Sequence, residues 1–184
     1  LFQRGDGGLV LGRPPVTDNS PLRVGKGSAY EGGVRVPLIV KWPGVIAPGS
    51  RSSEPVISVD YFPTIAAAVG VSGDLPPHLD GVSLLPVLRS GASLERDAIF
   101  WHYPHYHPGG ATPYSAVRTG DFRLVQFFED GRWELYNLKN DIGEQVDLSS
   151  TEPDKARQLA AKLDAWRRSV NAQMPTPNPD WDGN

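Results

Sequence analysis

Residues 21–42 read PLRVGKGSAYEGGVRVPLIVKW. The segment combines four glycines with several cations, and it leads into the apolar run at 38–40. Glycine lets a backbone approach a ligand closely, and a lysine held among glycines presents a compact positive charge to an anionic oxygen. The run over 36–42 predicts a buried strand. Loops that adjoin buried strands often hold the binding sites of α/β proteins, so this segment is the first candidate site.

The same segment closely resembles part of the sulfatase family, the sulfuric-ester hydrolases with the alkaline-phosphatase-like fold. Further blocks that resemble the family follow in family order along almost the whole chain. The blocks are PLR at 21–23, GKGS at 25–28, YEGGVRVP at 30–37, WPG at 42–44, Asp60 with Pro63-Thr64, DGVSLLP at 80–86, WHYPHY at 101–106, RTGDFRL at 118–124 and ELYNL at 134–138. Their joint occurrence carries the resemblance.

The resemblance implies a formylglycine nucleophile, made from the first residue of a Cys/Ser-x-Pro-x-Arg motif, and a calcium ion. The chain has no cysteine, and none of its serines begins such a motif. We therefore expect the nucleophile upstream of Leu1, so that this chain corresponds to the C-terminal portion of a sulfatase and is inactive alone. The opening Leu1-Phe2-Gln3, without methionine, indicates a fragment or a processed product.

Composition is typical of a folded soluble domain. Of 184 residues, 39% are hydrophobic and 21% are charged, and the formal net charge is −3. This balance calls for neither nucleic acid nor an anionic membrane, and no apolar run approaches membrane-spanning length. The absence of cysteine excludes disulfides and thiolate metal sites. The family resemblance implies a periplasmic, secreted or lysosomal location.

Periodicity and turn residues predict an α+β fold. It would comprise the end of an alkaline-phosphatase-like α/β layer and then a small antiparallel sheet packed on a C-terminal helix, with domains at 1–90 and 91–184. An Asp130-Gly131 pair predicts a two-residue hairpin, and Thr151 with Asp154 predicts a capping box. The expected elements are a strand at 36–42, a helix at 58–69, a helical turn at 83–88, strands at 98–103, 115–118, 122–128 and 132–138, a helix at 152–170 and an irregular tail at 175–184.

Two predicted helices carry an apolar face. On the first, Val59, Phe62, Ile65, Ala66 and Val69 share one side. The second, at 152–170, has a longer stripe of this kind, which we expect to form core against the sheet. The stripe consists of Ala156, Leu159, Ala160, Leu163, Trp166 and Val170.

Lys26 matches the sulfatase lysine that contacts the substrate sulfate, so the resemblance gives it a catalytic role; on the loop alone, a solvated lysine is the simpler interpretation. Asp6 is the candidate calcium ligand, although an ordinary turn before two glycines is favoured because one carboxylate cannot hold calcium alone. Glu31 and Arg35 are interpreted as scaffold that shapes the glycine loop.

His102, His105 and His107 lie close together in the sequence WHYPHYH. Their uneven spacing and Pro104 argue against a zinc site. Because similar sulfatase blocks lie near the substrate cleft, His102 or His105 is the candidate substrate contact. Hydrogen-bonded aromatic packing is the alternative.

Three functional hypotheses follow. The first is the C-terminal segment of a sulfatase, whose partners would be the N-terminal part of the catalytic domain and a sulfated small molecule or glycan. The second is a non-catalytic structural or sulfated-glycan-binding module, and the third is a phosphoryl hydrolase relative. Because a cut sheet exposes apolar surface, we also expect the isolated chain to self-associate or aggregate, or to rearrange its first fifty or so residues.

Overall fold

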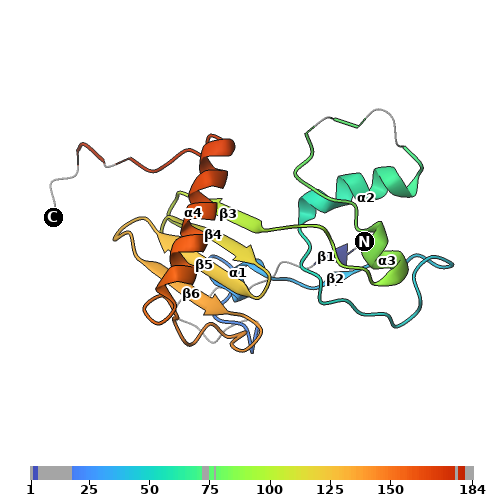
Figure 1. The fold of residues 1–184 in the computed structure, drawn as a ribbon, viewed down its shortest axis with the longest axis horizontal. Coiled ribbons are helices and arrows are strands. Elements are labelled where there is room, and N and C mark those ends of the chain that lie inside the picture. The colour runs from blue at the N-terminus through green and yellow to red at the C-terminus, as the bar shows by residue number, and fades with distance from the viewer. Residues whose placement is uncertain (1, 4–17, 72–74, 77, 177, 181–184) are drawn as a thin grey trace. The chain divides into compact units, whose positions relative to one another are not determined.

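The computed structural model describes residues 2–3, 18–71, 75–76, 78–176 and 178–180 (Figure 1). Contacts within the chain divide it into two units. The sheet–helix unit comprises residues 3–38 and 97–184, and the short-helix unit comprises residues 1–2 and 39–96.

The sheet–helix unit is built on a four-stranded antiparallel meander in the order β3-β4-β5-β6. Short links allow this topology. The two-residue turn between β4 and β5 places Gly120 at φ +55°, a conformation that glycine adopts without strain. The strands are β3 (Ile99–Tyr103), β4 (Tyr114–Thr119), β5 (Phe122–Phe127) and β6 (Trp133–Asn137). All four predicted strands of this region are confirmed within one or two residues at their ends.

Helix α4 (Pro153–Ser169) covers one face of this sheet, as the predicted C-terminal helix should. Most of its apolar stripe forms one buried cluster with the alternating apolar residues of the strands, but the predicted stripe residue Val170 is exposed. Phe100 of β3 also stacks on Trp166, with ring centroids 4.8 Å apart. The fully packed members of the cluster are Val117, Leu124, Leu135, Ala156, Leu159, Ala160 and Leu163.

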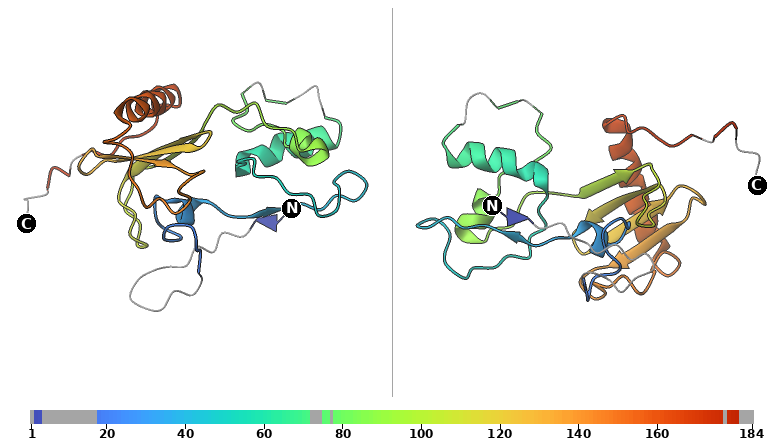
Figure 2. Two further views of the ribbon diagram at one scale, coloured as in Figure 1. Left: turned by 60° about the horizontal axis from the view of Figure 1, so that its bottom comes forward. Right: turned by 180° about the vertical axis from the view of Figure 1, so that it is seen from behind.

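The opposite face of the sheet is covered by the glycine-rich segment (Figure 2). This segment contains the single-turn helix α1 (Glu31–Val34). Its Ala29 joins a second buried cluster with Ala116 and Val125 of the sheet and with Ala111 of the loop between β3 and β4. The predicted antiparallel sheet with its C-terminal helix is therefore confirmed, and the glycine-rich segment covers the other face of that sheet.

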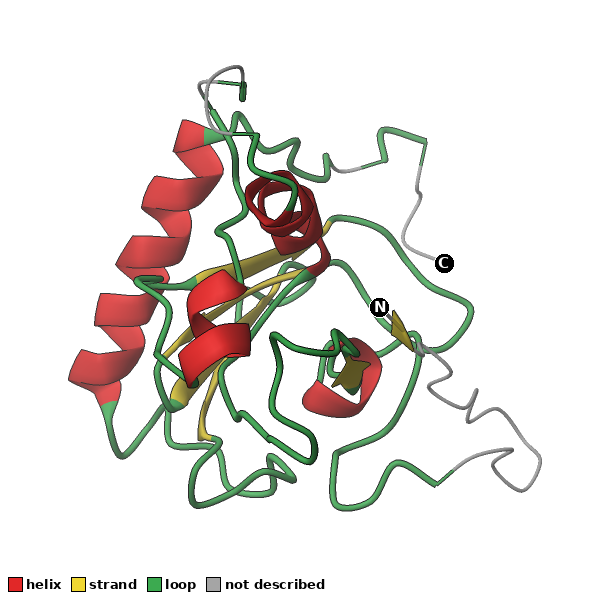
Figure 3. Ribbon diagram, turned by 90° about the vertical axis from the view of Figure 1, so that its right-hand side faces the viewer, coloured by secondary structure: helices red, strands yellow, loops and turns green. Residues whose placement is uncertain are grey.

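The short-helix unit contains helical pieces joined by long loops (Figure 3). The buried Asp60 organises it, because its carboxylate accepts hydrogen bonds from the backbone of Ile57 and Val82 at 2.9 and 3.0 Å and pairs with Arg96. Its helical elements are η1 (Ser58–Asp60), α2 (Tyr61–Ala68) and α3 (Leu85–Ser90), and the sequence boundary between the two units falls within β2 (Leu38–Ile39). Both predicted helical segments are thus confirmed.

The predicted buried strand at 36–42 is wrong. The structure has a strand only at Leu38–Ile39, and Ile39 is exposed. In the described residues β2 pairs only with the two-residue β1 (Phe2–Gln3), so no larger sheet covers it. A run of apolar residues favours a buried strand, but the strand is buried only where another part of the chain packs against it.

Two local predictions are also wrong. The first is the two-residue hairpin at Asp130-Gly131. Phe127 N–H donates to the Arg132 carbonyl at 3.0 Å, so the hairpin loop spans four residues, 128–131. The Asp130 side chain closes this turn by accepting a hydrogen bond from Arg132 N–H. Helix α4 begins without a capping box because the Thr151 hydroxyl donates to a carbonyl in the preceding turn. In the described part of the chain, no helix is long and apolar enough to span a bilayer.

Candidate functional site

The candidate site begins with a loop at 23–33 that folds back on itself. Gly32 N–H donates to the Arg23 carbonyl at 3.1 Å. A Cβ atom on Gly32 would lie 2.3 Å from that carbonyl oxygen, so the close approach requires glycine. Val24, at φ +59°, adopts a conformation that is costly for a β-branched residue. The loop is therefore held in a strained shape just before Lys26.

Lys26 is exposed at the tip of this loop. The next residue, Gly27, contacts the loop between β3 and β4: its carbonyl accepts a hydrogen bond from Ala111 N–H at 2.8 Å. The backbone on the C-terminal side of Lys26 is thus fixed while its ammonium group faces solvent. This arrangement leaves the charge free to meet an anion that approaches from outside the unit.

A buried ionic cluster anchors the loop to the sheet. The Arg123 guanidinium of β5 is fully buried and donates to Glu144 at 2.5 Å and to the Ala29 carbonyl. The other carboxylate oxygen of Glu144 accepts from Glu31 N–H at 2.7 Å. The Glu31 carboxylate lies 3.6 Å from Arg123 and 3.3 Å from Arg35. These contacts support the interpretation of Glu31 and Arg35 as scaffold.

The charged groups of this cluster are buried and paired with one another. Burial raises the pKa of the Glu144 carboxyl, while Arg123 acts in the opposite direction. Glu144 also has φ +51°, which is unusual for a residue other than glycine. Glu144 thus combines an ion pair with Arg123, a hydrogen bond from Glu31 and a strained backbone. Through these contacts it attaches the glycine loop to the sheet.

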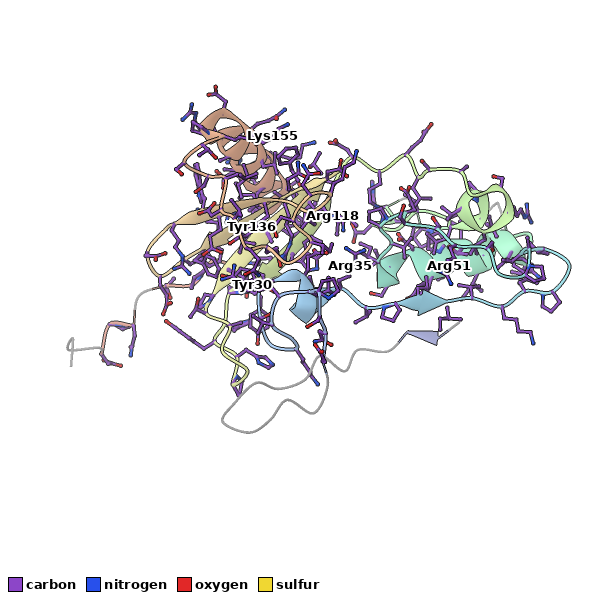
Figure 4. All side chains as sticks on the ribbon, turned by 90° about the horizontal axis from the view of Figure 1, so that it is seen from below. Tyr30, Arg35, Arg51, Arg118, Tyr136 and Lys155 are labelled. Carbon is purple, nitrogen blue, oxygen red and sulfur yellow. The ribbon has the colours of Figure 1, made fainter. Side chains whose placement is uncertain are left out.

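Two tyrosines form a second attachment beside the ionic cluster (Figure 4). The hydroxyls of Tyr30 and Tyr136 donate to the same Glu134 oxygen at 2.9 and 2.8 Å. The Arg23 guanidinium lies over the Tyr30 ring, 3.7 Å from its centroid, and donates to the Tyr136 hydroxyl at 3.0 Å. Burial, followed by the contact with Glu134, raises the pKa of Tyr30 to about 12 and also raises that of Tyr136. Both phenols therefore remain neutral donors at physiological pH.

The histidines separate onto two faces of the sheet. The ring nitrogens of His102 contact the Ser115 hydroxyl and the Gln173 carbonyl, each at 2.7 Å, and its ring lies against Phe128. His105 is exposed and meets the Tyr103 ring edge-on, with centroids 5.5 Å apart.

His107 lies on the side of the glycine loop. A Cβ atom on Gly27 would lie 2.4 Å from its Nδ1 atom. The histidine beside the Lys26 turn is thus neither of the two predicted as substrate contacts.

Sequence reasoning missed three residues that shape this site: His107, Arg123 and Glu144. Arg123 gave a usable signal, because a cation between the apolar residues of a central strand requires a buried partner. Glu144 gave none, since it lies in an irregular loop far along the chain. His107 belonged to the histidine cluster, but spacing alone does not reveal which histidine meets the glycine loop.

Metal binding has little support among these residues. Within the described residues, no group of three or more histidine, aspartate or glutamate side chains is arranged to hold a metal ion. Asp6, the candidate calcium ligand, lies outside the described residues. Sulfatases typically use calcium, but the residues described here do not provide its ligand set.

Comparison with known proteins identifies the family. Residues 24–170 match the family described as N-sulphoglucosamine sulphohydrolase, C-terminal. A sulfatase of Formosa agariphila is 40% identical over 187 residues, covering 94% of this chain and 33% of the relative. Human arylsulfatase A is 44% identical over 111 residues, covering 60% of this chain and 21% of that protein. The chain belongs to the sulfatase family and corresponds to its C-terminal region.

Solved structures agree with this assignment. Ps i-CgsB in complex with k-i-k-neocarrahexaose has a TM-score of 0.71 and 31% identity, covering 86% of this chain and 34% of that one. BT4656 in complex with its substrate D-glucosamine-2-N,6-O-disulfate has a TM-score of 0.66 and 30% identity, covering 77% and 30%. The chain thus spans about a third of the length of these proteins and of the Formosa sulfatase.

Proposed function

We propose that this chain forms the C-terminal part of a sulfatase that hydrolyses sulfate esters, and that Lys26 contacts the substrate sulfate. One observation carries the proposal: the hydrogen bond from Ala111 to Gly27 attaches the Lys26 turn to the histidine-bearing loop of the sheet. A fixed cation stabilises negative charge that develops on sulfuryl oxygens, because its position is set before the reaction starts.

The histidines contribute unequally to this proposal. Both ring nitrogens of His102 already have partners, whereas His105 is exposed beside Tyr103. Of the two candidate substrate contacts, His105 is therefore the better supported. The nucleophile has no counterpart in this sequence, so we propose that the isolated chain binds substrate groups weakly and does not turn them over.

The substrate class that we propose is a sulfated sugar. Two structures similar to this chain are complexes with a neocarrahexaose and with a disulfated glucosamine. In a longer sulfatase, the rest of the alkaline-phosphatase-like α/β layer and its calcium would complete the site. The exposed apolar face of α2 would contact that layer, because burial of such a face is favourable.

A binding experiment on the purified chain tests this proposal. The chain is titrated with D-glucosamine-2-N,6-O-disulfate and followed by amide NMR shifts. We expect shifts around residues 25–28, and Lys26→Ala should weaken binding about tenfold because a charged hydrogen bond is lost. Lys41→Ala is the matched control, since Lys41 is an exposed lysine of the short-helix unit.

A parallel assay with an aryl sulfate should give no turnover. Binding that Lys26→Ala leaves unchanged would refute the role of Lys26. Turnover by the purified chain would refute the proposal that the nucleophile lies elsewhere. Binding without hydrolysis is expected from either a sulfatase segment or a glycan-binding module, and the sequence upstream of Leu1 separates them: a Cys/Ser-x-Pro-x-Arg motif there identifies the sulfatase.

A further inference from the structure

We propose that His107 is a positioning residue for Lys26, because its imidazole ring fills the space left by the missing side chains of Gly27 and Gly109. The inference rests on the proposed sulfate-binding role of Lys26. It extends that site to His107, which lies 81 positions further along the chain. His107 acts on Lys26 through the backbone of Gly27.

The imidazole ring of His107 fits closely against two glycines. A Cβ atom added to Gly27 would lie 2.4 Å from the Nδ1 atom and 2.7 Å from the Cε1 atom of His107. A Cβ atom on Gly109 would lie 2.9 Å from the same nitrogen and 2.9 Å from the Lys26 carbonyl oxygen. Both glycines therefore leave room for the imidazole ring, and the ring occupies that room.

A network of hydrogen bonds fixes the ring and the turn together. His107 Nδ1 accepts from Gly109 N–H at 2.8 Å. His107 N–H donates to the Ala111 carbonyl at 2.9 Å, and Gly110 N–H donates to the His107 carbonyl at 2.9 Å. Ala111 N–H in turn donates to Gly27. The loop that carries His107 thus closes on itself and then bonds to the residue next to Lys26.

The chemistry of this contact requires an acceptor at Nδ1. The imidazole must leave that nitrogen unprotonated to receive the Gly109 hydrogen. The Tyr103 ring lies beside the imidazole, with the two ring centroids 6.2 Å apart. A side chain of similar reach with an acceptor in the same place should therefore preserve the turn, whereas a methyl group should not.

Three variants of the full chain test the inference. His107→Ala removes both ring and acceptor, and His107→Asn restores an acceptor oxygen near the Nδ1 position. His78→Ala, at an exposed histidine of the short-helix unit, is the matched control. Hydrogen exchange of the Ala111 amide reports on the bond to Gly27, and titration with D-glucosamine-2-N,6-O-disulfate reports on Lys26.

We expect His107→Ala to speed exchange of the Ala111 amide about tenfold and to weaken sugar binding about fivefold. His107→Asn should remain within about threefold of the wild type in both measurements. The melting temperature is measured alongside, because a purely structural role would lower stability without rescue by asparagine. His78→Ala should change neither quantity.

Unchanged exchange at Ala111 in folded His107→Ala would overturn the inference. If that variant does not fold, His107→Asn decides: retained protection at Ala111 supports the positioning role, and lost protection refutes it. Faster exchange in His107→Ala with no sugar binding by the wild type would leave the positioning role intact and refute the proposed function of Lys26. The two failures are therefore distinguishable.

Discussion

Helices α2 and α4 were both predicted from apolar residues at helical spacing, but their apolar faces lie in opposite environments. In α4 the predicted stripe is buried against the sheet from Ala156 to Leu163, whereas its last member, Val170, lies beyond the helix and is exposed. On α2 and the residues that flank it, the predicted face is largely exposed: Val59 is 44%, Phe62 53%, Ile65 59% and Val69 70% accessible. Apolar periodicity thus predicts a helix, whereas burial depends on whether the chain supplies a surface to cover it.

The two units also differ in how many side chains they bury. The sheet–helix unit buries two layers of side chains and a charged cluster around Arg123. The short-helix unit buries Asp60, Ala66, Leu84 and Leu85, while Phe62, Ile65 and Val69 remain accessible. Substitutions that remove interior groups should therefore have large effects in the first unit and small effects at the exposed positions of the second.

The largest expected effect is that of Arg123→Met. This change leaves the buried Glu144 carboxylate without its ion-pair partner and removes one of the cations near Glu31, which should lower the free energy of unfolding by about 4 kcal/mol. Urea denaturation followed by circular dichroism measures the loss. Arg157→Met, which breaks an exposed pair with Asp154, is the control and should cost less than about 0.5 kcal/mol. Equal effects would contradict the buried ionic anchor.

Next in size is the loss of a core side chain from α4. Leu163→Ala should lower the free energy of unfolding by about 3 kcal/mol, because it removes a fully buried side chain and leaves a cavity. Ile65→Ala on α2 makes a similar chemical change at an exposed position and should cost less than about 0.5 kcal/mol. The same urea titration measures both. A large effect of Ile65→Ala would show that the α2 face is covered in solution.

The exposed α2 face also predicts the association behaviour of the chain. We expect the isolated protein to self-associate, and the double change Phe62→Ser with Ile65→Ser should weaken association about tenfold or more, because two apolar side chains no longer need to be buried. Sedimentation velocity over a concentration series measures this effect. Val146→Ser, at an exposed valine of the sheet–helix unit, is the control. A monodisperse wild-type monomer would refute the prediction.

The smallest expected effect concerns Tyr30. Tyr30→Phe removes one of the hydrogen bonds to Glu134 and should cost about 1 kcal/mol near neutral pH. The pKa of Tyr30 is raised to about 12, so the folded state retains a proton that the unfolded state loses near pH 10. Stability from this group is present below pH 10 and declines as pH rises toward 12.

Urea midpoints measured at pH 9 and pH 11 test this dependence. The wild type should lose stability between the two values, and Tyr30→Phe should lose less, because Tyr136, whose pKa is also raised, still contributes. An equal loss in both proteins would assign the alkaline sensitivity to groups other than Tyr30.

Much of the fold could be predicted from sequence because local rules decide it. Alternating apolar residues set the strands of the meander, and the stripe from Ala156 to Leu163 set the final helix. Predictions failed where tertiary contacts dominate. The hairpin is longer than predicted because the Asp130 side chain closes a wider turn. The 36–42 run is only partly buried because, in the described residues, its short strand pairs with no strand other than β1.

The candidate site was predictable only in part, for a related reason. The glycines around Lys26 indicated a tight loop, and the structure has one. Which side chains support that loop depends on residues nearly a hundred or more positions away, such as Arg123 and Glu144. The spacing of the three histidines gave no means of finding that His107 meets Gly27.

The anchor of the glycine loop also dictates when that loop can form during synthesis. Glu31 meets Glu144 across 113 residues of sequence, and Arg23 meets Glu144 across 121. A ribosome that adds about 5–20 residues per second needs on the order of ten seconds to produce the second partner after the first. Until then the nascent segment around Lys26 lacks the Glu144 contacts that attach it to the sheet, so we expect its final attachment to be a late event in folding of the chain.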